Sequence, residues 1–175
     1  NGQTLVSQRN PQIKAALAIN PFTSGVFGDR GLASLAIPTA IVTGSDDPIA
    51  PAVPEQIGPF ARLDRPDKWL VLLAGGTHFS TLGATGDETI QFPPWVVGPR
   101  PDLAQRYIKA FATAFLKRYL NDDRTVEPLL SAAWAAAVSQ TELPLAIVRE
   151  VDPITFPNRS DRSPNRPSPT TTKQP

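Results

Sequence analysis

The chain contains no cysteine, no methionine and only one histidine among its 175 residues. Without cysteine, disulfides, thiolate metal sites and a cysteine nucleophile are excluded within these residues. Any catalysis must therefore use oxygen groups and the single imidazole. The sequence also begins without methionine and without the basic and apolar segments of a signal peptide. We therefore expect that its amino end is not the start of the gene.

The chain also has no large excess of positive or negative charge and no long apolar run. The 17 Lys and Arg residues balance 16 Asp and Glu residues, for a formal net charge of +1. Such a chain offers no basic surface for phosphates, so we expect no nucleic acid partner. Its longest nearly apolar stretch, residues 129–138, is far shorter than the ~20 residues of a membrane span. The sequence does not decide the cellular compartment, and it favours a secreted or periplasmic location over a cytoplasmic one.

Three short aliphatic runs bounded by turn residues predict buried strands at residues 13–19, 39–43 and 69–74. Their apolar residues are continuous rather than alternating, which is typical of a parallel sheet covered on both faces. Residues 53–63, with Pro54 in the first turn, predict a helix that joins the second and third strands. The fold class we expect is therefore α/β.

The second half of the chain predicts helices and then a tail. Residues 102–120 repeat apolar side chains every three or four positions, which predicts a helix that Asp102 is placed to cap. Residues 126–138 predict a second helix, and residues 145–148 are compatible with a short terminal strand. Residues 151–175 are rich in proline and polar residues, so they cannot bury enough apolar surface to offset the entropy of ordering. We therefore divide the chain into a folded part, residues 1–150, and a disordered tail, residues 151–175.

Chemically active residues follow two neighbouring strands of the predicted sheet. Asp46 and Asp47 come after the second strand, and Gly75, Gly76 and His78 come after the third. Ligands of such sheets bind at the carboxyl ends of the strands. A carboxylate at this edge can bind one nitrogen of His78, fix its tautomer and leave the other nitrogen as a general base.

Simpler interpretations of these residues stay open. His78 alone is compatible with an ordinary loop histidine, and the two aspartates are compatible with a turn completed by Pro48. A metal site built from Asp46, Asp47 and His78 is possible in principle, but no His or Cys at ligand spacing accompanies them.

The sequence Gly44-Ser45-Asp46-Asp47-Pro48-Ile49-Ala50-Pro51, followed later by Gly76-Thr77-His78-Phe79, resembles the acid and histidine loops of the α/β-hydrolase fold. The branch it resembles holds dienelactone-hydrolase-like, platelet-activating-factor-acetylhydrolase-like and cutinase-like esterases. The resemblance implies that Asp47 is the acid, that His78 is the base and that no cofactor is needed. It also implies that Phe22 lies where cutinase-like relatives place an aromatic ring, commonly Trp, against the bound acyl group.

The chain departs from this family in one respect, because the nucleophile motif Gly-x-Ser-x-Gly does not occur in it. In the family the serine precedes the acid, so the three strands would be the sixth, seventh and eighth. We therefore expect the carboxyl-terminal half of an α/β-hydrolase that is inactive alone. Its partner would be an amino-terminal portion carrying the serine and the oxyanion hole, and its substrate a small ester or lipid. The alternative is a hydrolase-like binding or structural subunit without a nucleophile.

Overall fold

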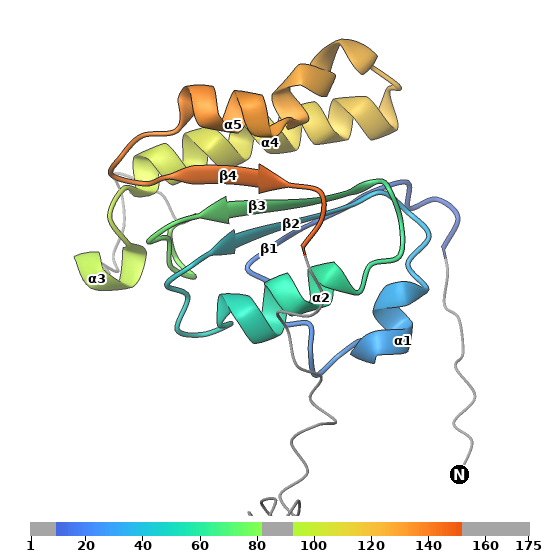
Figure 1. Cartoon of the computed structure of the whole chain (residues 1–175), viewed down its shortest axis with the longest axis horizontal. Coiled ribbons are helices and arrows are strands. Elements are labelled where there is room, and N and C mark those ends of the chain that lie inside the picture. The colour runs from blue at the N-terminus through green and yellow to red at the C-terminus, as the bar shows by residue number, and fades with distance from the viewer. Residues whose placement is uncertain (1–9, 82–92, 152–175) are drawn as a thin grey trace, which may run out of the picture.

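The computed structural model describes residues 10–81 and 93–151, and within them four strands form one sheet in the order β1-β2-β3-β4 (Figure 1). The strands are β1 (Ala16–Ile19), β2 (Thr39–Gly44), β3 (Lys68–Leu73) and β4 (Leu145–Val148). The first three run parallel and β4 runs antiparallel to β3. The predicted α/β fold with a parallel sheet is confirmed, and β4 adds an antiparallel strand at its edge. The predicted tail lies outside the described residues, apart from Val151.

The first strand is shorter and less buried than the sequence predicts. It begins at Ala16, whose N–H donates to the carbonyl of Pro38 at 2.9 Å, while Ile13 lies in a preceding turn and is 52% exposed. Within the described residues, β2 is the only strand beside β1. The prediction of a fully buried strand was therefore wrong here, because one edge of β1 has no neighbour to cover it.

The connection between β2 and β3 contains the predicted helix in a modified form. It opens with η1 (Val53–Ile57), a π-helical turn with Pro54 near its start, and continues as α2 (Gly58–Ala61). A proline fits there because the first turn of a helix has no internal acceptor for its missing N–H. Between β1 and β2 lies α1 (Gly28–Ala33), which the sequence analysis did not predict.

The long helix α4 (Pro101–Leu120) matches the prediction, but the predicted cap was wrong. Arg100 occupies the N-cap position, and Asp102 lies in the first turn. The Asp102 carboxylate instead accepts hydrogen bonds from Arg100 at 2.9 and 3.0 Å and from Arg106 at 3.3 Å. Pro101 moves the start of the helix one residue earlier because its fixed φ suits the first helical position.

The predicted helix at residues 126–138 is divided in two. A 3-10 helix, η2 (Arg124–Leu130), contains Pro128, and α5 (Ala132–Val138) follows it. The chain is extended at Ser131, whose hydroxyl accepts a hydrogen bond from the N–H of Trp134 at 3.1 Å. Ser131 is therefore the cap that restarts the helix.

The helices cover both faces of the sheet. Figure 1 shows α4 and α5 over one face and α1 and α2 over the other. The larger core lies beneath α4 and α5 and includes Val42, Val71, Phe111 and Phe115. The smaller core consists of Leu32, Ile41, Phe60, Leu63 and Leu70. Neighbouring residues of β2 thus point into opposite cores, as the two-residue period of a strand requires.

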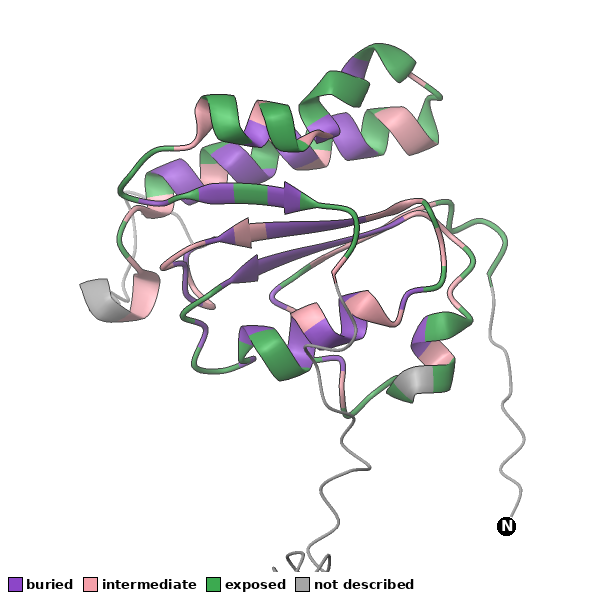
Figure 2. Ribbon diagram, in the orientation of Figure 1, coloured by how far each residue is buried: buried purple, intermediate pink, exposed green. Residues whose placement is uncertain are grey.

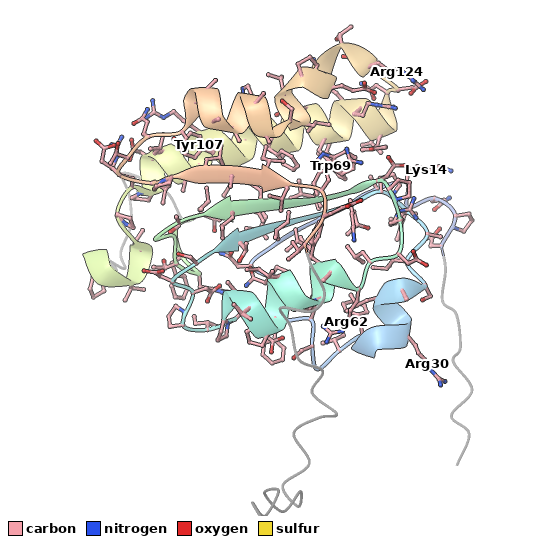
Figure 3. All side chains as sticks on the ribbon, in the orientation of Figure 1. Lys14, Arg30, Arg62, Trp69, Tyr107 and Arg124 are labelled. Carbon is pink, nitrogen blue, oxygen red and sulfur yellow. The ribbon has the colours of Figure 1, made fainter. Side chains whose placement is uncertain are left out.

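Several aromatic rings pack together in the larger core. Trp69 of β3 packs edge-on against Phe115 and Tyr119 of α4, and Figure 3 shows it between the sheet and that helix. The Tyr107 hydroxyl donates to the carbonyl of Val138 at 3.0 Å and accepts from the N–H of Gln140 at 2.9 Å. Figure 2 shows the buried residues on the facing sides of the helices and strands. Burial of the Phe115 ring, which is fully buried, contributes roughly 1.5–3 kcal/mol.

In the parts of the chain that the structure describes, none of the helices is both long enough and apolar enough to cross a bilayer.

Candidate active site

Asp47 lies in the turn that follows β2. Its Oδ1 accepts hydrogen bonds from the backbone N–H groups of Ile49 and Ala50, both at 2.8 Å. The residue is 4% exposed, so the carboxylate is shielded from water. The turn therefore holds Asp47 in one orientation, with Oδ2 directed away from its own backbone.

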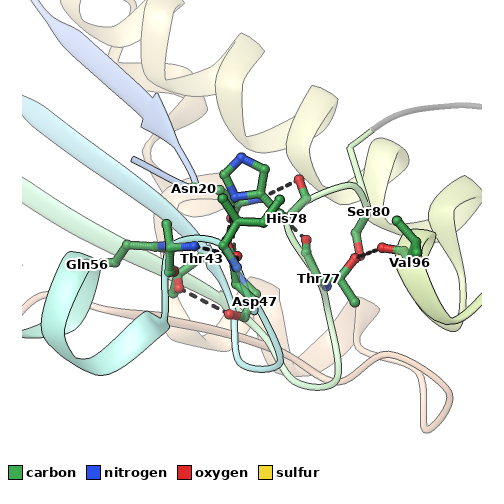
Figure 4. Close-up of polar contacts among 11 residues, drawn as sticks. Asn20, Thr43, Asp47, Gln56, Thr77, His78, Ser80 and Val96 are labelled. Atoms are coloured by element: carbon green, nitrogen blue, oxygen red, sulfur yellow. Dashed lines mark hydrogen bonds and ion pairs between the residues drawn. The ribbon is translucent and has the colours of Figure 1, made fainter. Parts of the chain in front are cut away.

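His78 lies in the turn that follows β3 and faces Asp47. Its Nδ1 is 2.8 Å from Asp47 Oδ2, and its side chain is 29% exposed whereas that of Asp47 is fully buried. An ionised carboxylate can only accept a hydrogen bond, so when Asp47 is ionised and the ring is neutral, Nδ1 carries the proton and Nε2 is left as an acceptor. Figure 4 shows the ring with its second nitrogen pointing away from Asp47. This arrangement can abstract a proton from a hydroxyl group.

The neighbouring carboxylate lies elsewhere. Asp46 is exposed, and its Oδ1 accepts a hydrogen bond from the Ser45 hydroxyl at 2.7 Å. Of the two adjacent aspartates, the structure therefore brings Asp47 to the imidazole.

Backbone hydrogen bonds join the two loops. The N–H of Asp46 donates to the carbonyl of Gly76 at 2.9 Å, and the N–H of Gly75 donates to the Ser45 hydroxyl at 2.7 Å. Gly75 adopts a φ of 81°, in the region that favours glycine. The acid and histidine loops thus form one unit at the carboxyl ends of β2 and β3.

A model of the PET hydrolase-like family matches residues 1–143. The chain belongs to the PET hydrolase-like family. Its members are ester-cleaving hydrolases of the α/β-hydrolase fold, and the resemblance to esterases of that fold is confirmed. No curated protein matches the chain.

In this PET hydrolase-like chain, Phe22 lies in the loop after β1 and is 58% exposed. Hydrogen bonds to Glu55, a buried residue of η1, hold this loop in place. Its carboxylate accepts hydrogen bonds from the N–H of Ser24 at 2.9 Å and from the Ser24 hydroxyl at 2.6 Å. The Thr23 hydroxyl donates to the Glu55 carbonyl. Phe22 therefore stands on an anchored loop, with much of its ring open to contact.

A second set of contacts holds the histidine loop and was not predicted from the sequence. The Ser80 hydroxyl accepts from the N–H of Thr77 at 2.8 Å and donates to the carbonyl of Val97 at 2.9 Å. The Thr77 hydroxyl donates to the carbonyl of Val96 at 2.6 Å. Val96 and Val97 belong to a short helix, α3 (Pro94–Val97). A Thr and a Ser three positions apart indicate a local turn, but nothing in the sequence indicates that α3 is their partner.

Neither a metal-ligand cluster nor the cavity beside Trp69 identifies a second active site in the part of the chain that the structure describes. Within residues 10–81 and 93–151, no group of three or more His, Asp or Glu side chains could hold a metal ion. A cavity of about 610 Å³ lies among Asp67, Trp69, Arg118, Glu127 and Arg149, and shares no residue with the Asp47–His78 pair. In this cavity Arg118 forms an ion pair with Glu127 at 2.8 Å, and the Arg149 guanidinium lies 3.9 Å from the centroid of the Trp69 ring. The Asp47–His78 pair, by contrast, brings a buried carboxylate within hydrogen-bond distance of a part-exposed imidazole.

Proposed function

We propose that this chain supplies the acid and the base of a serine carboxylic-ester hydrolase whose nucleophile and oxyanion hole lie on an amino-terminal portion. The observation that carries the proposal is the 2.8 Å contact between His78 Nδ1 and the buried Asp47 carboxylate. A buried acid, a part-exposed imidazole and an Nε2 without a hydrogen-bond partner among the described residues suit the activation of a serine hydroxyl.

The reaction then follows two matched steps. The serine oxygen attacks the ester carbonyl while His78 Nε2 takes its proton, and Asp47 stabilises the imidazolium. The proton passes to the departing alcohol, which leaves an acyl-enzyme. Water repeats the attack with His78 again as base, and the acid product and the free serine are formed. No cofactor takes part.

The open edge of β1 supports the proposed amino-terminal portion. Beside β2, β1 has no other strand neighbour within the described residues. On β1 and in the segments beside it, several large apolar residues are between 40% and 67% exposed: Ile13, Ile19, Phe22, Val26 and Phe27. A bare strand edge beside apolar side chains invites association. A further parallel strand, the one that precedes the nucleophile in this fold, would pair with β1 and cover part of this surface.

The substrate we propose is a carboxylic ester whose acyl group rests against Phe22. The ring is exposed and its loop is anchored by Glu55, so an apolar or aromatic acyl group can stack on it at little cost in side-chain ordering. The family description names a PET hydrolase, which makes aromatic polyesters one class of substrate to test alongside small esters and lipids.

We also propose a secreted or periplasmic location.

The experiment compares residues 1–175 alone with the same chain co-expressed with the upstream piece. We expect the isolated chain to aggregate in sedimentation and to leave a chromogenic short-chain ester intact. The combined pieces should be monodisperse, hydrolyse the ester and react with a phosphonate probe of activated serine. A stable, active monomer from residues 1–175 alone would overturn the proposal.

The second candidate is a hydrolase-like subunit that binds ligands or partners without catalysis, and the absence of Gly-x-Ser-x-Gly from the chain favours it. The sequence upstream of Asn1 separates the two. An elbow serine there supports the hydrolase, and a sequence without one supports the binding subunit.

A further inference from the structure

Asn20 is a buried polar residue to which the proposed reaction assigns no role. It follows β1, is 7% exposed and has a φ of 47°, in the left-handed region. Asparagine tolerates this conformation better than most residues other than glycine. A buried amide must also find hydrogen-bond partners, since leaving it unpaired is destabilising.

The partners of Asn20 lie on the ends of the other two parallel strands. Its Nδ2 donates to the carbonyl of His78 at 2.9 Å and lies 3.4 Å from the carbonyl of Thr77. Its Oδ1 accepts from the N–H of Gly44, the last residue of β2, at 3.3 Å. Its own N–H donates to the carbonyl of Val42 at 2.9 Å. One side chain therefore joins the ends of β1 and β2 to the backbone of the histidine itself.

These contacts require an amide. The group facing Thr77 and His78 must donate, because both partners are carbonyl oxygens, while the group facing Gly44 must accept. An aspartate would place a negative charge against two carbonyl oxygens. Glycine would accept the backbone angle but offer no contact. Among side chains of this length, asparagine alone provides both functions.

We propose that Asn20 is a positioning residue that fixes the base against the acid. Its amide holds the backbone of His78, and Asp47 Oδ2 holds the imidazole of the same residue. Because the main chain and the ring of His78 are both held, Nε2 points in one direction relative to β2 and the acid loop. The inference rests on the proposed function, because that function makes the direction of Nε2 matter.

The test uses Asn20→Asp, which keeps the shape but removes the donors, and Asn20→Gly, which keeps the backbone angle but removes the amide. Asn121→Asp is the matched control, because it makes the same chemical change at an exposed position beyond α4. Each variant of residues 1–175 is combined with the upstream piece. We measure kcat and KM for a chromogenic ester and the folded fraction by circular dichroism.

A second readout does not depend on hydrolysis. His78 is the only histidine of this chain, so ¹⁵N-histidine labelling of residues 1–175 before assembly reports a single ring. In the parent protein we expect the low-field proton signal of an Nδ1–H bound to a carboxylate. In both Asn20 variants this signal should broaden or be lost, and kcat should fall up to about 100-fold with KM little changed, because small misplacements of a catalytic group have costs of that size. Asn121→Asp should match the parent protein.

The outcomes separate the two ideas. In one outcome the parent protein is inactive but the Asn20 variants still disturb the His78 signal. That result would refute the proposed function and support the positioning role. An active parent with unchanged kcat and an unchanged His78 signal in both variants would overturn the positioning role. Unfolding of both variants would also overturn it, in favour of a purely structural role.

Discussion

Gly44 approaches Gly76 so closely that a Cβ atom on Gly44 would lie 2.3 Å from the Gly76 carbonyl oxygen and 2.5 Å from its carbonyl carbon. Gly44 ends β2, just before the acid loop, and Gly76 precedes His78 by two residues. Both atoms that a side chain would meet belong to the backbone, so neither can rotate aside. The distance between acid and base is therefore set by the absence of a side chain at position 44.

Gly44→Ala should consequently separate the two loops. We expect a loss of about 1–3 kcal/mol in the free energy of unfolding, in the range of overpacked sites, and a large loss of ester hydrolysis in the assembled protein. Urea unfolding and ester turnover measure the two effects. Gly31→Ala is the control, because a Cβ there would meet Phe27 Cβ at an ordinary 3.4 Å within α1. If Gly44→Ala behaved like Gly31→Ala, the close approach would have no consequence for the site.

His78→Ala should remove nearly all turnover in the assembly that contains the nucleophile. The fold should survive, because the imidazole is partly exposed and lies at the edge of the sheet rather than in either core. Hydrolysis of the chromogenic ester and the far-ultraviolet circular dichroism spectrum check the two parts of this expectation. Full activity in the folded variant would exclude His78 from the mechanism.

Asparagine substitutions at the two adjacent aspartates should have very different effects on kcat. Asp47→Asn retains an oxygen for the N–H groups of Ile49 and Ala50 but removes the charge that orients and stabilises the imidazolium. We expect a loss of about 10⁴-fold in kcat, as for the same change in a serine protease. Asp46→Asn, at an exposed position bonded to Ser45, should cost little. The opposite ranking of the two variants would show that Asp46 is the acid.

Asp102 should make the stability of the assembled protein depend on pH at the acidic end. Hydrogen bonds from Arg100 lower the pKa of this carboxyl from 3.8 to about 2. Because the folded pKa lies below the unfolded one, the stabilisation is present above about pH 4 and is lost as pH falls through about 2. Asp102→Asn should therefore lower the unfolding temperature near neutrality, with the difference vanishing towards pH 2.

High salt is the control for the Asp102 prediction. The Asp102 side chain is 59% exposed, so 1 M salt should reduce the difference between parent and variant at neutral pH. An unfolding-temperature difference that was constant from pH 7 to pH 2 would show that the carboxylate acts through something other than its charge.

The sequence predicts the strands and the two loops well because these features are local. Residues 39–43 and 69–74 are continuous apolar runs, and the structure buries them between two helical layers. Asp47 and His78 could be located because parallel strands bring their carboxyl ends to one edge. The burial of residues 13–19 was predicted wrongly because burial depends on which strand lies beside β1, and a sequence pattern does not specify its neighbour.

The contacts that support the site were harder to predict because their partners are distant in sequence. Asn20 binds the histidine loop, Glu55 binds Ser24, and α3 accepts hydrogen bonds from Thr77 and Ser80. Each of these polar residues is also common in turns, so its type alone does not reveal a buried partner. The break of the predicted helix at Ser131 was missed. Pro128 and Ser131 are both present in residues 126–138 and are the local signals for such a break.

The late position of β4 in the chain has a consequence for synthesis on the ribosome. β1, β2 and β3 follow one another along the chain with short connections, whereas β4 pairs Leu145 with Leu73 only after α4, η2 and α5 have been made. Domains begin to fold while translation is still in progress. The β3 side of the growing sheet must therefore stay unpaired until β4 emerges, and during that interval nascent chains on one polysome are exposed to mispairing with each other.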